Sequence, residues 1–241
     1  MKRIALGAGV AALAIGGAAA AGLAGGSGAT EASASGYDGK RTYDITVTNT
    51  TPEGSQPLSP PLLVVHNRRA DVWSVGDAAS HVVAAIAEDA NNGPAEQLLG
   101  QVPGVKSVET GVDEGAASPA PIGPGASQTY RITARPNHRL SLLSMLVNTN
   151  DGFTGLDSVR IGRNHRSVET AAYDAGSEAN NQLKSHIPGP CCGMPFVRDP
   201  EGNLISIHAG IQSGVGELDP AVYGWEGAVA KIQIKRVRDR H

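Results

Sequence analysis

Residues 43–48 read Tyr-Asp-Ile-Thr-Val-Thr, so that apolar and polar side chains alternate along the chain. Successive side chains of a β-strand point to opposite faces, and this period of two predicts a half-buried strand. Many short strands separated by Gly, Pro and Asn clusters predict an all-β fold, an antiparallel β-sandwich or barrel. We expect further strands at 62–66, 105–112, 128–135, 140–147, 158–161, 168–173, 204–208 and 229–237.

One part of the chain has a helical period instead. Residues 78–90 are rich in Ala and place Val82, Val83 and Ile86 on one helical face, and 94–99 predicts a second short helix. Both helices lie between early strands, and we expect them to cover one open end of the sandwich. The simplest organisation is one domain spanning 40–241.

The composition limits the possible partners. With 40% hydrophobic and 18% charged residues in a chain of 241, the protein can bury a core. Its formal net charge of −3 argues against a nucleic-acid partner, because binding phosphate requires a basic face. Only 4% of the residues are aromatic, which leaves few rings for stacking on bases. We therefore expect no nucleic acid.

The first residues are typical of a secretory signal peptide. Met1-Lys2-Arg3 precedes an uncharged apolar run at 4–24, and small residues allow cleavage after Ala20 or Ala21, or after Ala34. A retained membrane anchor is the alternative, since about 20 apolar residues can span a bilayer. We expect 1–34 to be signal peptide and lead-in, and the protein to be secreted, periplasmic or on the cell surface.

The cysteines and histidines carry weaker signals. Cys191 and Cys192 are adjacent, so within one chain they form either a vicinal disulfide ring or two free thiols. His66 and His208 lie in apolar strands and are interpreted as hydrogen-bonded core or edge residues, and His81 as a surface or capping residue. We interpret Glu88-Asp89 as a solvated helix end, with the alternative that it contributes oxygens to a nearby ion. The chain lacks the common signatures Gly-x-Ser-x-Gly, Walker loop and His-Glu-x-x-His, and we expect no enzyme.

Two acidic clusters follow predicted strands, at 148–157 and at 174–178. If 158–161 and 168–173 form a hairpin, both clusters reach the same rim of the sandwich, where their carboxylates would repel one another without a cation. Hard oxygen ligands on loops are what Ca²⁺ requires. The first cluster is not an EF-hand loop, because its twelfth position is Val159 and not Glu. Asn-Gly and Asp-Gly steps are also ordinary turn chemistry, and this alternative stays open.

The order of several stretches resembles the spondin N-terminal domain. They are the strand at 43–47, the His66 segment with Trp73-Ser74-Val75-Gly76, the helix end at 86–88, and 140–146, 150–157, 173–178 and 228–232. The resemblance implies an eight-stranded antiparallel sandwich similar to C2 domains, with one calcium ion held by loop carboxylates.

Carried over by position, the implied calcium ligands are Asp151, Asp174 and Glu178, with Asp157 in reserve. The family motifs are Pro-Ser-Pro-Asp-Trp and Asp-Ala-Gly-Thr-Asp. Here Asn148, Asn150 and Gly152 replace the two prolines and the aromatic residue, and Glu178 replaces the last aspartate. Loss of the tryptophan leaves Phe153 as the apolar side chain offered at this rim.

The resemblance favours a secreted, calcium-binding, non-enzymatic adhesion module of the cell surface or extracellular matrix, with an extracellular protein or glycan as partner. A C2-like module that binds a membrane surface is possible but less favoured, because the rim lacks a basic cluster. A metal-assisted hydrolase is the least favoured alternative, since it needs a convergent residue such as His208 or Glu88. The long loop at 180–201 is the expected region for partner contacts, or a structural lid.

Overall fold

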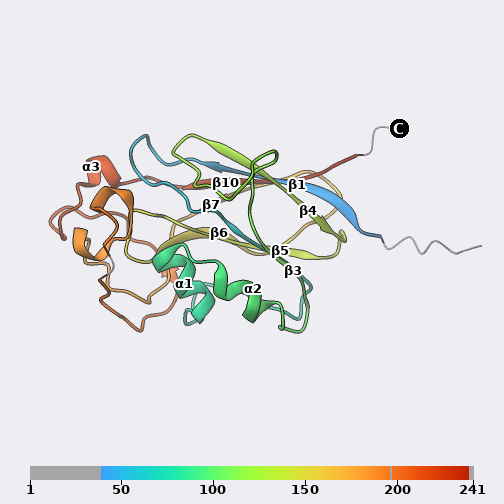
Figure 1. The fold of residues 1–241 in the computed structure, drawn as a ribbon, viewed down its shortest axis with the longest axis horizontal. Coiled ribbons are helices and arrows are strands. Elements are labelled where there is room, and N and C mark those ends of the chain that lie inside the picture. Colours follow the sequence, from blue (N-terminus) through green and yellow to red (C-terminus); the bar gives the residue numbers. More distant parts are fainter. Residues whose placement is uncertain (1–38, 196, 239–241) are drawn as a thin grey trace, which may run out of the picture. The chain divides into compact units, whose positions relative to one another are not determined.

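A computed structural model describes residues 39–195 and 197–238. The chain divides after Gly36, and the sandwich belongs to the second unit, Tyr37–His241. The expected signal segment at 1–34 lies outside the described residues. Two antiparallel sheets pack face to face, which confirms the all-β sandwich (Figure 1).

The first sheet has four strands in the order β4-β1-β10-β7. Its central strand β1 has alternating burial, with Tyr43, Ile45 and Val47 fully buried, as the period of two predicts. Ile45 lies opposite Ile234 on one side and Tyr130 on the other, so the register keeps one apolar face toward the second sheet. The strands are β1 (Arg41–Asn49), β4 (Ser127–Ala134), β7 (Arg166–Thr170) and β10 (Ala230–Arg236).

The second sheet has six strands in the order β3-β2-β5-β6-β8-β9. All five residues of β2 are buried, which shows that this strand is covered on both faces. The resemblance implies eight strands, and the two-residue strands β8 and β9 are short additions at one edge of this sheet. The strands are β2 (Leu62–His66), β3 (Val105–Thr110), β5 (Arg139–Met145), β6 (Gly152–Arg160), β8 (Tyr173–Asp174) and β9 (Ser206–Ile207).

The predicted hairpin of 158–161 with 168–173 is wrong. The strand β6 begins already at Gly152, and it pairs with β5 and β8. The strand β7 pairs with β10 in the other sheet. The chain therefore crosses between the sheets at 161–165, a step that local side-chain patterns do not encode.

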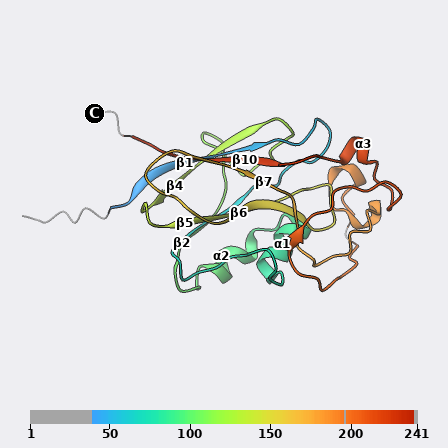
Figure 2. The same ribbon diagram turned by 180° about the vertical axis from the view of Figure 1, so that it is seen from behind.

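The helices α1 (His81–Asp89) and α2 (Gly93–Leu99) lie between β2 and β3 in sequence, as predicted. Ser80 caps α1, because its hydroxyl accepts a hydrogen bond from the Val83 amide. Val83 and Ile86 belong to a buried cluster with Leu143 of β5. The helices thus cover a face of the six-stranded sheet, and the prediction that they close an end is wrong (Figures 1 and 2).

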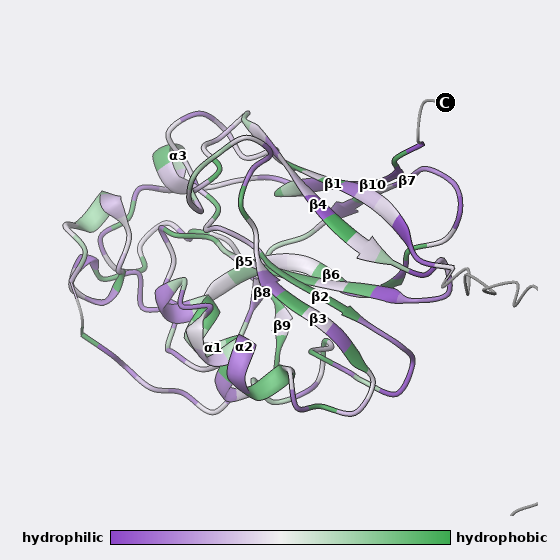
Figure 3. Ribbon diagram, turned by 45° about the vertical axis from the view of Figure 1, so that its right-hand side comes forward, coloured by the Kyte–Doolittle hydropathy of each residue, from purple (hydrophilic) through white to green (hydrophobic). Residues whose placement is uncertain are grey.

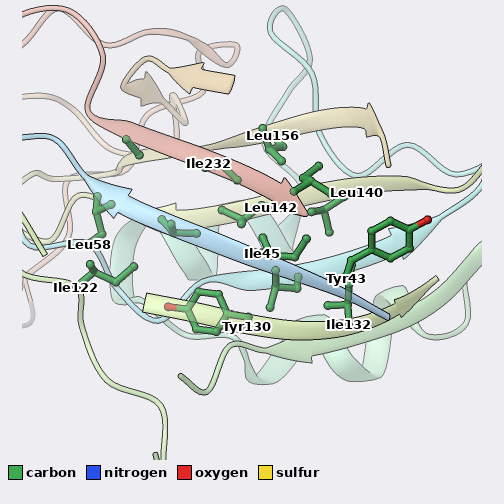
Figure 4. Close-up of a cluster of buried hydrophobic side chains, with 14 of the residues drawn as sticks. Tyr43, Ile45, Leu58, Ile122, Tyr130, Ile132, Leu140, Leu142, Leu156 and Ile232 are labelled. Carbon is green, nitrogen blue, oxygen red and sulfur yellow. The ribbon is translucent and has the colours of Figure 1, made fainter. Parts of the chain in front are cut away.

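The main core lies between the two sheets (Figure 4). Tyr43 and Tyr130 of the first sheet pack there with Leu140, Leu142 and Leu156 of the second. Each such side chain stabilises the fold by about 1.5–3 kcal/mol when it is fully buried. The hydropathy colouring shows hydrophobic and hydrophilic residues in alternation along β4 (Figure 3).

The chain between β8 and β10 is mostly irregular. It contains the short helices η1 (Lys184–His186), η2 (Pro190–Cys192) and α3 (Pro220–Tyr223). Within η2, Cys191 and Cys192 form a vicinal disulfide, the first of the two expected alternatives. No helix of the described residues is long and apolar enough to cross a bilayer.

Candidate functional site

The two acidic clusters lie side by side where β6 begins. Gly152 pairs with Asp174 across β6 and β8, and the Ala175 amide donates to the Asp151 carbonyl oxygen at 3.2 Å. The convergence that the sequence predicts is therefore present. It comes from the β6–β8 pairing and not from the predicted hairpin.

Asp151 is a fully buried carboxylate with one satisfied oxygen. Its Oδ2 accepts hydrogen bonds from the amides of Ser177 and Glu178 at 2.8 and 3.0 Å, and from the Ser177 hydroxyl at 3.3 Å. Its Oδ1 is buried and accepts no hydrogen bond within the described chain. Burial and the nearby charge of Asp174 raise the pKa of Asp151 to about 7, although the two amides and the hydroxyl lower it. The free oxygen therefore favours a proton or a cation.

Asp174 is half-buried and is oriented by its own loop. Its Oδ1 accepts from the Gly176 amide at 2.7 Å, and its Oδ2 accepts from the Asn180 side-chain amide at 2.5 Å. These bonds fix the carboxylate close enough to raise the pKa of Asp151. Asp151 and Asp174 are thus an electrostatically coupled pair of acids.

Glu178 is also buried, with 1% of its surface exposed. Within the part of the chain that the structure describes, neither carboxylate oxygen accepts a hydrogen bond, and Oε1 forms an ion pair with Nε of Arg198 at 3.2 Å. Burial raises the pKa of Glu178 to about 8, and the charges of Glu88, Asp151 and Asp199 add to this rise. The counterion of Glu178 in this arrangement is an arginine.

Arg198 joins the long loop to α1. It also forms ion pairs with Glu88, at 3.7 Å, and with Asp89. The interpretation of Glu88-Asp89 as a solvated helix end is therefore wrong, because both acids belong to a network around Arg198. Nothing in the spacing of Arg198 indicates this role, since it lies in irregular chain far from α1 in sequence.

The residues present fit a hard cation in part. Carboxylate oxygens are suitable Ca²⁺ ligands, and Asp151 Oδ1 is a buried acceptor without a donor. The ion pair of Glu178 with Arg198 counts against Glu178 as a ligand in this arrangement. Across residues 39–195 and 197–238, no three His, Cys, Asp or Glu side chains form a ready-made metal group.

The reserve ligand Asp157 lies away from this cluster. It is exposed on β6, about 16 Å along the strand from Gly152 at the usual rise per residue. Its Oδ2 accepts from the Ser74 hydroxyl at 2.9 Å. Asp157 therefore connects β6 to the segment before α1.

The histidines follow their interpretation closely. His66 is buried, with Nδ1 at 3.0 Å from the Asn67 carbonyl and Nε2 at 2.9 Å from the Ser141 hydroxyl, which confirms a hydrogen-bonded core residue. His81 is exposed at the start of α1. His208 is buried beside Trp225, and its Nδ1 accepts from the Gly210 amide at 2.9 Å. Burial lowers the pKa of His208, against the opposing charge of Asp174.

Phe153 is not available as an apolar probe at the rim. It is fully buried and packs edge-on against Trp73, with 5.0 Å between the ring centres. The long loop instead exposes three large apolar side chains, Leu183, Met194 and Val197, of which Met194 is the most exposed at 74%. The expectation that Phe153 is the apolar side chain offered at the rim is therefore wrong. The long loop supplies exposed apolar side chains instead.

Comparison with known proteins adds no family. A scan of protein-family models and a search of curated proteins find no match to this chain. The likeness to the spondin N-terminal domain thus stays an expectation from the sequence.

Proposed function

We propose that the protein is an extracytoplasmic, non-enzymatic β-sandwich module that binds calcium through Asp151, Asp174 and Glu178. The observation that carries this proposal is Asp151, a buried acid beside Asp174 with one oxygen that accepts no hydrogen bond from any described residue. A buried carboxylate in this state destabilises the fold unless a cation or a proton neutralises it. The resemblance to the spondin domain supports calcium as that cation and adhesion as the activity.

The role of the ion in this proposal is structural. Asp151 already binds the Ser177 and Glu178 amides, so an ion on its second oxygen joins the start of β6 to the loop after β8. Extracellular calcium sites bind at about 10⁻⁴–10⁻³ M. Binding to the folded state then stabilises it by about 2.7 kcal/mol at a hundred times Kd.

Glu178 distinguishes two versions of the site. In one version Glu178 exchanges Arg198 for calcium, while Arg198 keeps Glu88 and Asp89. In the other version Glu178 remains with Arg198, and Asp151 and Asp174 hold the ion with backbone or water oxygens. Glu178→Gln abolishes calcium stabilisation in the first version and leaves it in the second.

The test is the melting temperature of the mature chain in calcium and in chelator. We expect calcium to raise it, magnesium to raise it less, and Asp174→Asn to remove most of the rise. Asp71→Asn is the matched control, because Asp71 is exposed and has no hydrogen bond or ion pair within the described residues. Equal melting of the parent protein in calcium and chelator would contradict the site.

The exposed Met194 and Val197 favour one alternative, a calcium-dependent module that binds membranes. Apolar side chains on a loop near a calcium site can enter a bilayer whose lipid phosphates complete the coordination. Sedimentation with phosphatidylserine vesicles tests this function. Calcium-dependent pelleting that Met194→Ser abolishes would favour it over adhesion to a protein or glycan.

A further inference from the structure

Basic residues gather at the end of the sandwich opposite the acidic loops. The strand β6 runs from Gly152, beside Asp174, to Arg160, which pairs with Arg139 at the start of β5. At this far end β1 starts and β10 finishes, because Tyr43 lies opposite Arg236. The net charge of −3 therefore hides a separation of charge between the two ends.

A first hollow of about 520 Å³ lies beside the turn between β4 and β5. Lys40, Lys106, Arg135 and His138 line it, together with the single acid Glu109 and Arg131. Burial and then the charges of Arg135 and Lys106 lower the pKa of His138, which shows how closely these cations approach it. The hollow is lined by more basic than acidic side chains, and one of the basic ones, Arg131, is paired with Asp44 and Glu114.

A second hollow of about 440 Å³ lies on the other side of the same turn. Arg160, Arg163 and Arg166 line it, together with the backbone-rich turn Pro136-Asn137 and Gly162. All three arginines are exposed, and none forms an ion pair within the described part of the chain. Among the described residues that line this hollow, none is acidic.

The surface around the hollows is also basic. Arg68 and Arg69 follow β2, and Lys235 and Arg238 lie at the end of β10, and all four are exposed. Among the described residues, the exposed large apolar side chains do not lie on these loops. Several positive sites spread over two hollows fit a ligand with repeated negative charges.

We propose that this basic end binds an extended anionic polymer whose charges are phosphate groups. Arginine predominates there, and its planar guanidinium donates paired hydrogen bonds to phosphate oxygens. The two hollows bind separate stretches of one polymer chain. The site is independent of the calcium proposal, because it uses the opposite end of the sandwich.

The test measures binding of long-chain inorganic polyphosphate to the mature chain in chelator, between about 50 and 200 mM salt. We expect the affinity to fall as the salt concentration rises. The double variant Arg163→Gln/Arg166→Gln should weaken binding about tenfold. It should also reduce the slope of log affinity against log salt concentration by about 1 for each phosphate that the variant no longer neutralises. The matched control Lys184→Gln/Lys231→Gln removes the same charge from exposed positions outside the basic end and should bind like the parent.

Parallel measurements identify the source of the phosphate. Duplex DNA and phosphatidylglycerol vesicles are compared at equal phosphate concentration, and heparin tests sulfate. Tighter binding to heparin or to the vesicles than to polyphosphate would overturn the assignment to a phosphate polymer. Tighter binding to duplex DNA would overturn polyphosphate as the polymer that this end binds. Absence of polyphosphate binding, or equal loss in the control variant, would overturn the site.

Discussion

Asp151→Asn should have opposite effects on stability in the absence and presence of calcium. Asparagine keeps the shape of the side chain, and its carbonyl oxygen can accept the three hydrogen bonds that Asp151 Oδ2 accepts from Ser177 and Glu178. Its amide group then occupies the position of Oδ1, which has no donor. In chelator the substitution therefore removes a buried charge and retains the hydrogen bonds.

The size of the effect follows from the pKa of Asp151, which is raised from 3.8 to about 7. Because the folded state holds the proton more tightly, this group destabilises the fold as pH rises from 3.8 through about 7. A rise of about three in the pKa of Asp151 corresponds to a destabilisation of about 4 kcal/mol at most. Relaxation of the site reduces the expected destabilisation to about 2–4 kcal/mol. For a domain of this size that is about 5–15 °C in Tm.

The assay is thermal unfolding of both proteins across pH 4 to 8, with Asp71→Asn as the matched control. In chelator the Tm advantage of Asp151→Asn should grow as pH rises through this range. In calcium the order should reverse, because only the parent gains stability from the ion. A variant that is less stable than the parent in chelator at pH 8, or that keeps the parent's pH dependence, would refute the reasoning.

Three further predictions concern the network around Arg198, the pairing of β5 with β6, and the disulfide. Arg198→Gln leaves the buried Glu178 without its counterion and should lower the free energy of unfolding by about 3–5 kcal/mol at pH 8, measured by urea denaturation. The loss should be smaller at pH 6, where a pKa of about 8 keeps Glu178 protonated, and Arg198→Gln/Glu178→Gln should recover part of it. Gly155→Ala should abolish the folded circular dichroism spectrum, because a Cβ at this position overlaps the Leu142 carbonyl. The control variant Gly202→Ala should fold, because open space surrounds Gly202. Reduction of Cys191–Cys192 should lower stability by only roughly 1 kcal/mol in a melt with and without reductant, because the bond closes the smallest possible loop in the unfolded chain.

The sandwich could be predicted wherever one face of a strand is apolar. Alternation in β1 identifies Tyr43, Ile45 and Val47 as core residues, and all three are fully buried. The start of β6 escapes prediction because Asp151-Gly152 has the composition of a turn. Position 155 within β6 requires a glycine, because the backbone of Leu142 approaches too closely for any side chain there. Such a contact depends on the neighbouring strand and leaves no local pattern.

The site could be predicted as two acidic segments but not as a set of contacts. That Asp151 and Asp174 come together follows from strand ends meeting at one rim, even though the expected pairing is incorrect. The counterion Arg198 lies in a loop without periodicity, so its contact with Glu178 depends on tertiary packing alone. Likewise, net charge is a sum over the chain, and it gives no indication that Arg160, Arg163 and Arg166 share one hollow.

Since β1 begins where β10 finishes, both ends of the domain leave the sandwich from the same side (Figures 1 and 2). A sensor chip, bead or fusion partner attached through either terminus would hold the molecule by its arginine-rich face. That geometry turns the acidic loops at the start of β6 away from the support and shields the hollows beside Arg135 and Arg163. Protein immobilised in this way suits a test of the proposed calcium site, and a test of the proposed polyphosphate site requires a different attachment chemistry.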